Sequence, residues 1–312
     1  MGGRRMKIIF MGTPEFAVPS LEMLLKHHEV VAVVTQPDKP KGRGKKLMFS
    51  PVKEKALQAG IEVLQPEKVK EKEFIEILKN YHADLIAVTA FGQILPEEIL
   101  NMPKYGCINV HGSLLPKYRG AAPLQWAVIN GEKETGVTTM YMAKGMDTGD
   151  MLLKEKIEVS SQDTYGSIHD KLCVIGAELL LKTIEGLEKG TLQRIPQQEE
   201  QATYASMLTK ESGHIDWSKK CDEIICLIHG LDPVPTAYTI YEGEVLKVWQ
   251  AEKIQQPTGK IGEITAITKK GFVVTAGDGS ILVTEVQAKG KKRMGTDAYL
   301  RGHHVEIGTI LQ

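Results

Sequence analysis

The sequence predicts an α/β fold, in which a doubly wound, mostly parallel Rossmann-like sheet is followed by a small OB-like β-barrel domain. From residue 7 to residue 89, short apolar runs alternate with helical stretches, the order that places strands in parallel. From residue 236 onward, β-like runs are separated by turn residues at near-regular spacing, which is typical of a small barrel. A polar, Gln- and Glu-rich segment lies between the two patterns. We therefore expect a first domain over residues 6–190, a linker over 191–206 and a second domain over 207–312.

The elements of the first domain follow from its apolar patterning. Asp163 is expected to cap its last helix, whose apolar positions recur every three to four residues and form a core-facing stripe. The expected strands are residues 7–12, 30–35, 61–64, 85–89, 107–111, 135–142 and 151–159. The other expected helices are residues 14–26, 50–58, 70–81 and 120–130.

The second domain is expected to begin with a short helix around residues 221–229. Its strands are expected to be short and separated by turn residues. They are expected at residues 236–241, 246–254, 259–268, 271–275 and 280–287.

The turn after the first strand does not support a dinucleotide site. Gly12-Thr13-Pro14-Glu15-Phe16 has one glycine where the dinucleotide-binding fingerprint requires three. We therefore expect the doubly wound sheet without that site. In such a sheet, the ligand cleft lies outside the carboxyl ends of the strands.

Composition limits the possible partners. Hydrophobic residues are 42% and charged residues 25% of the 312, which is ordinary for a soluble globular protein. The 39 basic residues balance the 39 acidic ones, so nucleic-acid binding must rest on local patches. Four cysteines lack a metal-binding CxxC spacing, which favours reduced thiols in a cytoplasmic protein. No apolar run is long enough for a membrane span, and residues 1–5 lack the apolar region of a secretory signal, so we expect Met6 to open the folded part.

Three polar side chains indicate the chemistry. Asn109 and His111 alternate along one strand, so they lie on the same face about 6–7 Å apart, and Asp147 follows in the loop 145–150. An amide, an imidazole and a carboxylate without an obvious nucleophile are suited to stabilising charge and moving protons. When an amine attacks a carbonyl carbon, Asn109 and a protonated His111 can bind the developing oxyanion. Asp147 can take the amine proton directly, through water or through the imidazole. A lone histidine at a strand end is more often structural, but its companions here favour catalysis.

The residues around this set resemble a known signature. Residues 109–116 (NVHGSLLP) and 118–123 (YRGAAP) resemble the signature of the folate-dependent formyltransferases, and Gly136-Val137-Thr138 and residues 146–149 (MDTG) resemble its second block. The resemblance implies that Asn109, His111 and Asp147 act on the formyl group of 10-formyltetrahydrofolate, with no metal. The resemblance implies that Ser113, Leu114, Leu115 and Pro116 line the folate pocket. Phe91, Gly92, Ile94 and Leu95 follow the end of an earlier strand, where an open sheet holds its ligand, so they are candidates to pack on the flat pterin ring. Apolar residues after a strand are nevertheless more often simple core.

The last third of the chain also resembles part of this family. The formyltransferases that act on methionyl-tRNA have an OB-like second domain, and their Lys-Lys-Arg-Met and Leu-Arg-Gly elements are similar to residues 291–294 and 300–302. One departure is residues 232–238, where the family usually has a Trp before the second proline and a Gly after it. The resemblance implies a cytoplasmic enzyme whose catalytic domain formylates the α-amine of initiator methionyl-tRNA, and whose second domain binds that tRNA. We expect a monomer, although the sequence does not decide whether the chain self-associates.

Two basic runs are candidates for tRNA contact. Five basic residues lie between 39 and 46 with only Gly and Pro among them, so we expect a loop without helix or strand, overhanging the cleft and meeting the acceptor end of the tRNA. A solvated charge run is the alternative. A second run, in the barrel domain, would hold phosphates. The candidate residues are Lys39, Lys41, Arg43, Lys45, Lys46, Lys291, Lys292 and Arg293.

Other functions share parts of this pattern. A glycinamide formyltransferase shares the active-site motif but has no reason to carry the last hundred or so residues. A formyltransferase of a sugar-nucleotide amine, or a folate hydrolase domain, shares more of the layout, but the two basic runs favour tRNA. A non-catalytic RNA-binding protein explains the barrel and the basic loop but not the Asn–His–Asp set. Measuring tetrahydrofolate release with and without methionyl-tRNA separates these alternatives.

Overall fold

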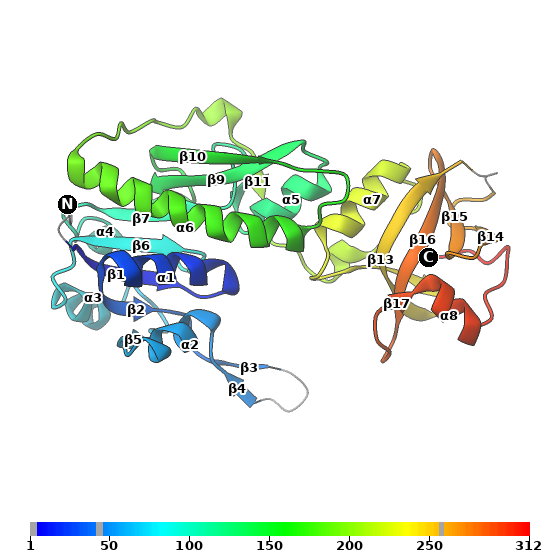
Figure 1. The fold of residues 1–312 in the computed structure, drawn as a ribbon, viewed down its shortest axis with the longest axis horizontal. Coiled ribbons are helices and arrows are strands. Elements are labelled where there is room, and N and C mark those ends of the chain that lie inside the picture. Colours follow the sequence, from blue (N-terminus) through cyan, green and yellow to red (C-terminus); the bar gives the residue numbers. More distant parts are fainter. Residues whose placement is uncertain (1–4, 42–45, 256–258) are drawn as a thin grey trace. The chain divides into compact units, whose positions relative to one another are not determined.

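A computed structural model describes residues 5–41, 46–255 and 259–312, which divide into two compact units (Figure 1). The first unit comprises the chain up to Gly120 together with Thr135–Ile157 and His169–Ala205. The second unit comprises Ala121–Glu134, Glu158–Ile168 and Ser206–Gln312. Most of the segment expected as a linker is therefore part of the first unit. In the three described ranges, no helix combines the length and the apolarity that a bilayer span requires.

The first unit is built on a seven-stranded sheet whose order is β10-β9-β7-β6-β1-β2-β5 (Figure 1). The strands from β5 to β7 pair in parallel, and β9 is antiparallel to β7. This mixed, mostly parallel sheet confirms the predicted Rossmann-like class. The strands are β1 Lys7–Gly12, β2 Glu29–Val34, β5 Val63–Leu64, β6 Leu85–Thr89, β7 Cys107–His111, β9 Glu134–Tyr141 and β10 Met151–Glu158.

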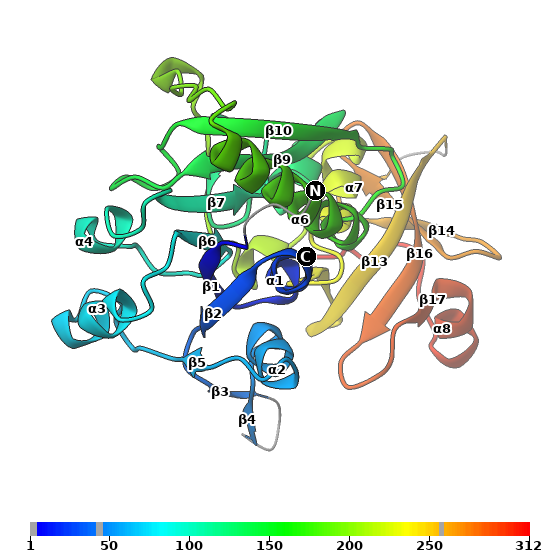
Figure 2. The same cartoon turned by 60° about the vertical axis from the view of Figure 1, so that its left-hand side comes forward.

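Helices cover both faces of this sheet, because its buried strands carry apolar residues in both directions. Phe10 and Ile108 pack in one cluster with Leu180 of α6, while Ile9 and Leu78 of α3 share the opposite cluster. Figure 2 shows α3 and α4 on the side of the sheet away from α1 and α6. The helices of this layered unit are α1 Val18–His27, α2 Pro51–Gln58, α3 Lys72–Lys79, α4 Glu97–Leu100 and α6 Tyr165–Lys189.

The strand order creates a switch point beside β1. The chain moves from β1 outward to β2 and β5, and then returns to β6 on the other side of β1. Loops leaving the carboxyl ends therefore diverge there, which is where open α/β sheets bind ligands. The loops are tied together, since Thr13 Oγ1 and Gln36 Nε2 both donate to the carbonyl oxygen of Phe91, at 3.2 and 3.1 Å.

Two local predictions are wrong for identifiable reasons. The basic segment contains strands, because β3 Lys39–Lys41 and β4 Lys46–Met48 pair antiparallel despite the Gly and Pro residues of the run. The cap of α6 lies one residue later than expected. Thr164 Oγ1 accepts from Ser167 N, and Ser167 Oγ accepts from Thr164 N, whereas Asp163 accepts from Ser160 N in the preceding turn.

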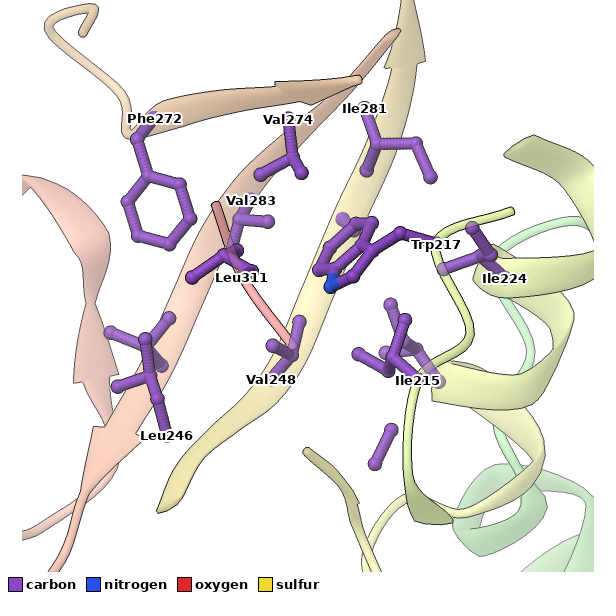
Figure 3. Close-up of a cluster of buried hydrophobic side chains, with 14 of the residues drawn as sticks. Ile215, Trp217, Ile224, Leu246, Val248, Phe272, Val274, Ile281, Val283 and Leu311 are labelled. Carbon is purple, nitrogen blue, oxygen red and sulfur yellow. The ribbon is translucent and has the colours of Figure 1, made fainter. Parts of the chain in front are cut away.

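The second unit packs helices against an antiparallel sheet ordered β12-β13-β16-β15-β14, with β17 beside β16. Figure 3 shows the Trp217 side chain between Ile281 and Val248 of the sheet and Ile224 of α7. The indole nitrogen of Trp217 donates to Thr239 Oγ1 at 3.0 Å, so this large side chain is buried with its polar atom satisfied. The elements are α5 Pro123–Ile129, α7 Cys221–Gly230, β12 Ala237–Tyr241, β13 Glu244–Ile254, β14 Ile264–Ile267, β15 Phe272–Ala276, β16 Gly279–Ala288, β17 Met294–Gly295 and α8 Thr296–Gly302.

The predicted barrel is not closed by its strands. Among the described residues, no strand pairing joins β12 to β14, so the sheet has two edges. The last residues of the chain bond to both edges, since Gln312 exchanges main-chain hydrogen bonds with Ile240 and Leu311 N donates to Gly262 O at 2.8 Å. The unit is therefore an antiparallel sheet whose edges are bridged by the C-terminal segment.

Short elements complete the description. Two-residue strands, β8 Arg119–Gly120 and β11 Tyr204–Ala205, pair in parallel within the first unit. Single turns of 3-10 helix occur at Glu15–Ala17, Glu199–Gln201 and Glu211–Gly213. None of these follows from the apolar patterning of the sequence.

Candidate active site

The central strand β7 positions the amide and the imidazole. Asn109 pairs with Val88 of β6 on one side and Met140 of β9 on the other, and His111 pairs with Thr138. A strand held by neighbours on both sides is rigid, and its period of two gives both side chains one face. Asn109 is 9% exposed and His111 6%, so the two polar groups are buried at the carboxyl end of the strand.

The two nitrogens of His111 have different partners. Nε2 lies 2.9 Å from the carbonyl oxygen of Tyr118. Because a carbonyl oxygen only accepts, Nε2 carries a proton and donates it. Nδ1 lies 3.7 Å from Asp147 Oδ1, which is longer than a direct hydrogen bond. Nδ1 therefore faces the carboxylate and keeps its capacity to bond to a reacting atom.

Asp147 is held by contacts from distant parts of the chain. Its Oδ2 accepts from Gly120 N at 2.8 Å, which leaves Oδ1 directed toward the imidazole. Its main chain has a φ of +52°, in the left-handed region that non-glycine residues rarely adopt. The alternative that Asp147 only caps its own loop is not favoured, because the carboxylate bonds across to Gly120.

Of Asn109, His111 and Asp147, Asn109 is the residue whose side chain makes no hydrogen bond within the described structure. Within the part of the chain that the structure describes, its amide has no hydrogen-bond partner. Its amide atoms do not belong to the buried polar atoms that lack a partner, so they are accessible at the surface of the site. Its donor group is free for an atom of a bound substrate.

The segment implied to line the folate pocket is firmly held. Ser113 Oγ donates to Lys117 O at 2.6 Å, and Thr138 Oγ1 donates to Ser113 O at 2.7 Å. Leu115 is buried, and its carbonyl oxygen accepts from Lys154 Nζ at 2.5 Å. Its neighbours Leu114 and Pro116 are half-buried. The pocket role of this segment stays a prediction.

The earlier folate candidates differ in exposure. Phe91 and Leu95 are each 3% exposed and belong to the core cluster with α3 and α4, so packing accounts for both. Ile94 is 68% exposed, and Gly92 has a φ of +87° at the turn between them. Of these four residues, Ile94 and Gly92 are exposed, and a contact of either with folate stays a prediction.

The basic candidates are only partly described. Arg43 and Lys45 lie outside the described residues. Lys39 is exposed on β3, and Lys41 and Lys46 are opposite each other in the β3–β4 pairing. In the second unit, Lys291 and Lys292 are exposed.

Arg293 has partners within its own unit. Its guanidinium lies 3.3 Å from Asp232 Oδ1 and 2.7 Å from Glu285 Oε2, and it stacks 4.4 Å from the ring centroid of Trp249. Burial raises the pKa of the Asp232 carboxyl, and the Arg293 charge opposes that rise. These contacts give Arg293 a structural role that its place in a basic run did not indicate.

Sequence reasoning missed two residues next to the site. Arg119 lies in the motif of residues 118–123, but nothing in the motif indicates its side-chain contacts. These contacts, with Gln197 and Glu199, join positions 78 and 80 residues apart. Gln197 lies in the segment whose composition predicted a linker. No local pattern signals such long-range pairs.

Comparison with known proteins covers both units. The family model described as "Formyl transferase" matches residues 6–184, and "Formyl transferase, C-terminal domain" matches residues 207–304. A methionyl-tRNA formyltransferase of Acetivibrio thermocellus is 54% identical over 309 residues, covering 98% of this chain and 99% of that protein. One of Caldanaerobacter subterraneus is 53% identical, with 98% and 100% covered.

Solved structures share the fold at low identity. HypX from Aquifex aeolicus in complex with tetrahydrofolic acid has a TM-score of 0.64 at 19% identity, covering 98% of this chain and 51% of that one. A sugar 3N-formyl transferase, solved in the presence of dTDP and 5-N-formyl-THF, has a TM-score of 0.67 at 21% identity, covering 93% and 100%.

Proposed function

This chain belongs to the methionyl-tRNA formyltransferase family, whose members transfer a formyl group to methionyl-tRNA, and we propose that Asn109, His111 and Asp147 perform the transfer here. The observation that supports this assignment is geometric. The Asn109 amide, which has no hydrogen-bond partner among the described residues, and an imidazole facing a carboxylate lie together at the carboxyl end of β7. These side chains can stabilise the oxyanion and remove the proton when an amine attacks a formyl carbon.

In the first step, the neutral amine of the methionyl group attacks the formyl carbon of the donor. No covalent enzyme intermediate is needed. The attack forms a carbon–nitrogen bond and leaves a negative oxygen on the tetrahedral carbon. The Asn109 amide and a proton on His111 Nδ1 stabilise that oxygen, in a site where burial strengthens both interactions.

In the second step, the amine nitrogen loses a proton and the bond to the donor nitrogen breaks. Asp147 Oδ1 accepts the proton directly, through water, or through the imidazole, in which case His111 Nδ1 passes its own proton to Asp147 and takes up the amine proton. The leaving nitrogen of the folate takes up a proton, so the net change is one formyl group and one proton exchanged between the two amines. Asp147 also compensates the positive charge of the imidazolium.

The proposed donor is 10-formyltetrahydrofolate, bound at the switch point of the sheet. Gly92 and Ile94 leave the carboxyl end of β6, and Ser113 to Pro116 leave that of β7. Both segments therefore border the same end of the sheet, where the reacting carbon must lie near Asn109. The proposed acceptor is the initiator methionyl-tRNA, in the cytoplasm. A monomeric state stays a prediction.

The test is formyl transfer by the purified chain. With 10-formyltetrahydrofolate and charged initiator tRNA, we expect stoichiometric tetrahydrofolate and formyl-methionyl-tRNA, and no tetrahydrofolate without the acceptor. A dTDP-amino sugar as acceptor tests the second candidate, because a sugar formyltransferase has the same fold. Transfer to the sugar but not to methionyl-tRNA would reverse the assignment of substrate, and tRNA binding without any transfer would favour a non-catalytic protein.

A further inference from the structure

A segment far along the chain packs beside the loop that carries Gly120. Strand β11 pairs in parallel with β8, so that Ala205 lies opposite Gly120. Tyr118 N donates to Thr203 Oγ1, and Arg119 N donates to Thr203 O, both at 2.8 Å. The main chain that bonds to His111 and Asp147 is therefore itself held by residues 203–205.

Arg119 is the largest fully buried side chain in the described structure, at 1% exposure. Its Nη1 donates to both carboxylate oxygens of Glu199, at 3.0 and 2.8 Å, and its Nε donates to Gln197 Oε1 at 3.0 Å. A buried guanidinium requires such partners, and its planar shape fixes their directions. The position of the Gln197 amide is thus determined by Arg119.

The orientation of that amide follows. Because Gln197 Oε1 accepts from Arg119, the NH₂ group faces the other way. It donates to the carbonyl oxygens of Asp147 and Gly149, at 2.7 and 2.8 Å. One side chain therefore holds two carbonyl groups of the loop that presents the catalytic carboxylate.

The loop needs such support. The main chain of Asp147 is in the left-handed region, and a non-glycine residue keeps that conformation only where the surrounding structure enforces it. Without the two hydrogen bonds, relaxation of the main chain would turn Oδ1 away from His111 Nδ1, which is already 3.7 Å distant. Displacements on the order of 1 Å at a reacting centre cost about 100-fold in rate.

We infer that Gln197 is a positioning residue that keeps Asp147 in its catalytic conformation, and that Arg119 acts through Gln197. The inference rests on the proposed function, since it gives Gln197 its effect through Asp147. Neither residue touches the reacting atoms. Their contribution is the conformation of the loop between β9 and β10.

The test compares two substitutions in the otherwise intact chain. Gln197→Met has nearly the same size but neither donor nor acceptor, and Gln197→Glu keeps the acceptor for Arg119 while losing the donor to the loop. We expect either variant to lower kcat with methionyl-tRNA about 10- to 100-fold while KM for the folate and for the tRNA changes less than about twofold. Gln198→Met, at the exposed neighbouring position, is the matched control and should turn over like the unaltered chain.

A double-mutant cycle separates positioning from general stability. In an Asp147→Ala background, measured by single turnover at high enzyme concentration, Gln197→Met should cause little further loss, because its target is gone. An equal fold-loss in both backgrounds, or a Gln197→Met variant with unaltered kcat, would overturn the inference. If the unaltered chain does not formylate methionyl-tRNA at all, the proposed function fails before any variant is compared.

Discussion

Individual residues of the site are held in backbone conformations that side chains usually avoid. Ala90, Tyr118 and Asp147 have φ values of +47°, +60° and +52°. Ala90 follows the carboxyl end of β6, Tyr118 accepts from His111 through its carbonyl oxygen, and the Asp147 carboxylate faces His111, so all three lie near the end of β7 where the chemistry is proposed. Such conformations concentrate at functional sites, where the surrounding structure enforces them. The geometry of the proposed site therefore depends on main-chain conformation as well as on side chains.

Removing an oxyanion donor should slow the reaction without unfolding the chain. Asn109→Ala and His111→Ala are each expected to lower kcat 100- to 1000-fold, about 3–4 kcal/mol of transition-state stabilisation. The Asn109 amide has no partner among the described residues, so its loss breaks no internal hydrogen bond. Steady-state kinetics and thermal melting of each variant are the measurements. Turnover near that of the unaltered chain would exclude that residue from the oxyanion site.

Replacing the carboxylate at constant shape tests proton transfer. Asp147→Asn retains an oxygen that can accept from Gly120 N, but it cannot take up the amine proton. We expect turnover to be lost while folate binding, followed by fluorescence titration, is retained. If Asp147 only shapes its loop, the Asn variant should stay active, since Asn tolerates the left-handed conformation as well as Asp does.

How far the site could be predicted depends on the range of its contacts. Asn109 and His111 share a face because of the two-residue period of a strand, which is visible in the sequence. Asp147 was placed by its resemblance to a family motif, and its 3.7 Å distance from the imidazole appears only in the fold. Gln197 could not be found, because its bonds to the loop span 48 and 50 residues of chain.

At the scale of elements, hydrophobic periodicity predicted the long helices and buried strands within a few residues. Hydrophobic periodicity did not predict the short strands, whose structure is determined by main-chain pairing. The β3–β4 and β8–β11 pairs involve two or three residues each, too short to carry a period. Their residues include Gly and Pro, which argue against strands in any propensity scale. Short pairings of this kind are fixed by their neighbours in space.

The β8–β11 pair requires glycine at position 120. A Cβ added there would lie 2.6 Å from Ala205 O, at a φ of +118°. Gly120→Ala should therefore separate the strands, displace the N–H that binds Asp147, and lower both the free energy of unfolding and kcat. Gly190→Ala is the matched control, since Gly190 also has a positive φ, +67°, but a Cβ there meets nothing within 4 Å. The control should lose only about 1–2 kcal/mol, and activity should be unchanged. Urea unfolding and steady-state kinetics are measured for both variants. If Gly120→Ala and Gly190→Ala lower the free energy of unfolding and kcat by the same amounts, the strand-pairing explanation is wrong.

The basic run at the start of β17 contains two kinds of residue. Arg293→Ala leaves the buried Asp232 carboxyl without its cation, so the variant should melt at a lower temperature. Lys291→Ala and Lys292→Ala remove exposed charges, and they should leave the melting temperature within experimental error while weakening tRNA binding at low salt. Calorimetry and filter binding on the three variants give the comparison. If Arg293→Ala lowers tRNA affinity, the two lysine variants do not, and its melting temperature is unaltered, then Arg293 binds phosphate and has no structural role.

At the scale of the whole molecule, charge is balanced but unevenly placed. The 39 basic and 39 acidic residues give no net field to attract a polyanion. Binding of tRNA must then depend on segments where positive charge is concentrated, and residues 39–46 hold five basic residues in eight positions. Lys39, at the start of β3, is exposed.

We expect Arg43 to contribute most within that run, because its flanking glycines allow close approach and its planar fork can bind phosphate or a base edge through two hydrogen bonds. Arg43→Ala should weaken methionyl-tRNA use strongly, leave folate binding unchanged, and reduce the slope of log affinity against log salt by about one charge. Lys72→Ala removes one exposed charge from α3 and is the control for charge alone. Kinetics with methionyl-tRNA over a salt series decide whether this run binds tRNA or is a solvated charge run. If Arg43→Ala and Lys72→Ala give the same curve as the unaltered chain, the run is a solvated surface, and the protein must hold its tRNA elsewhere.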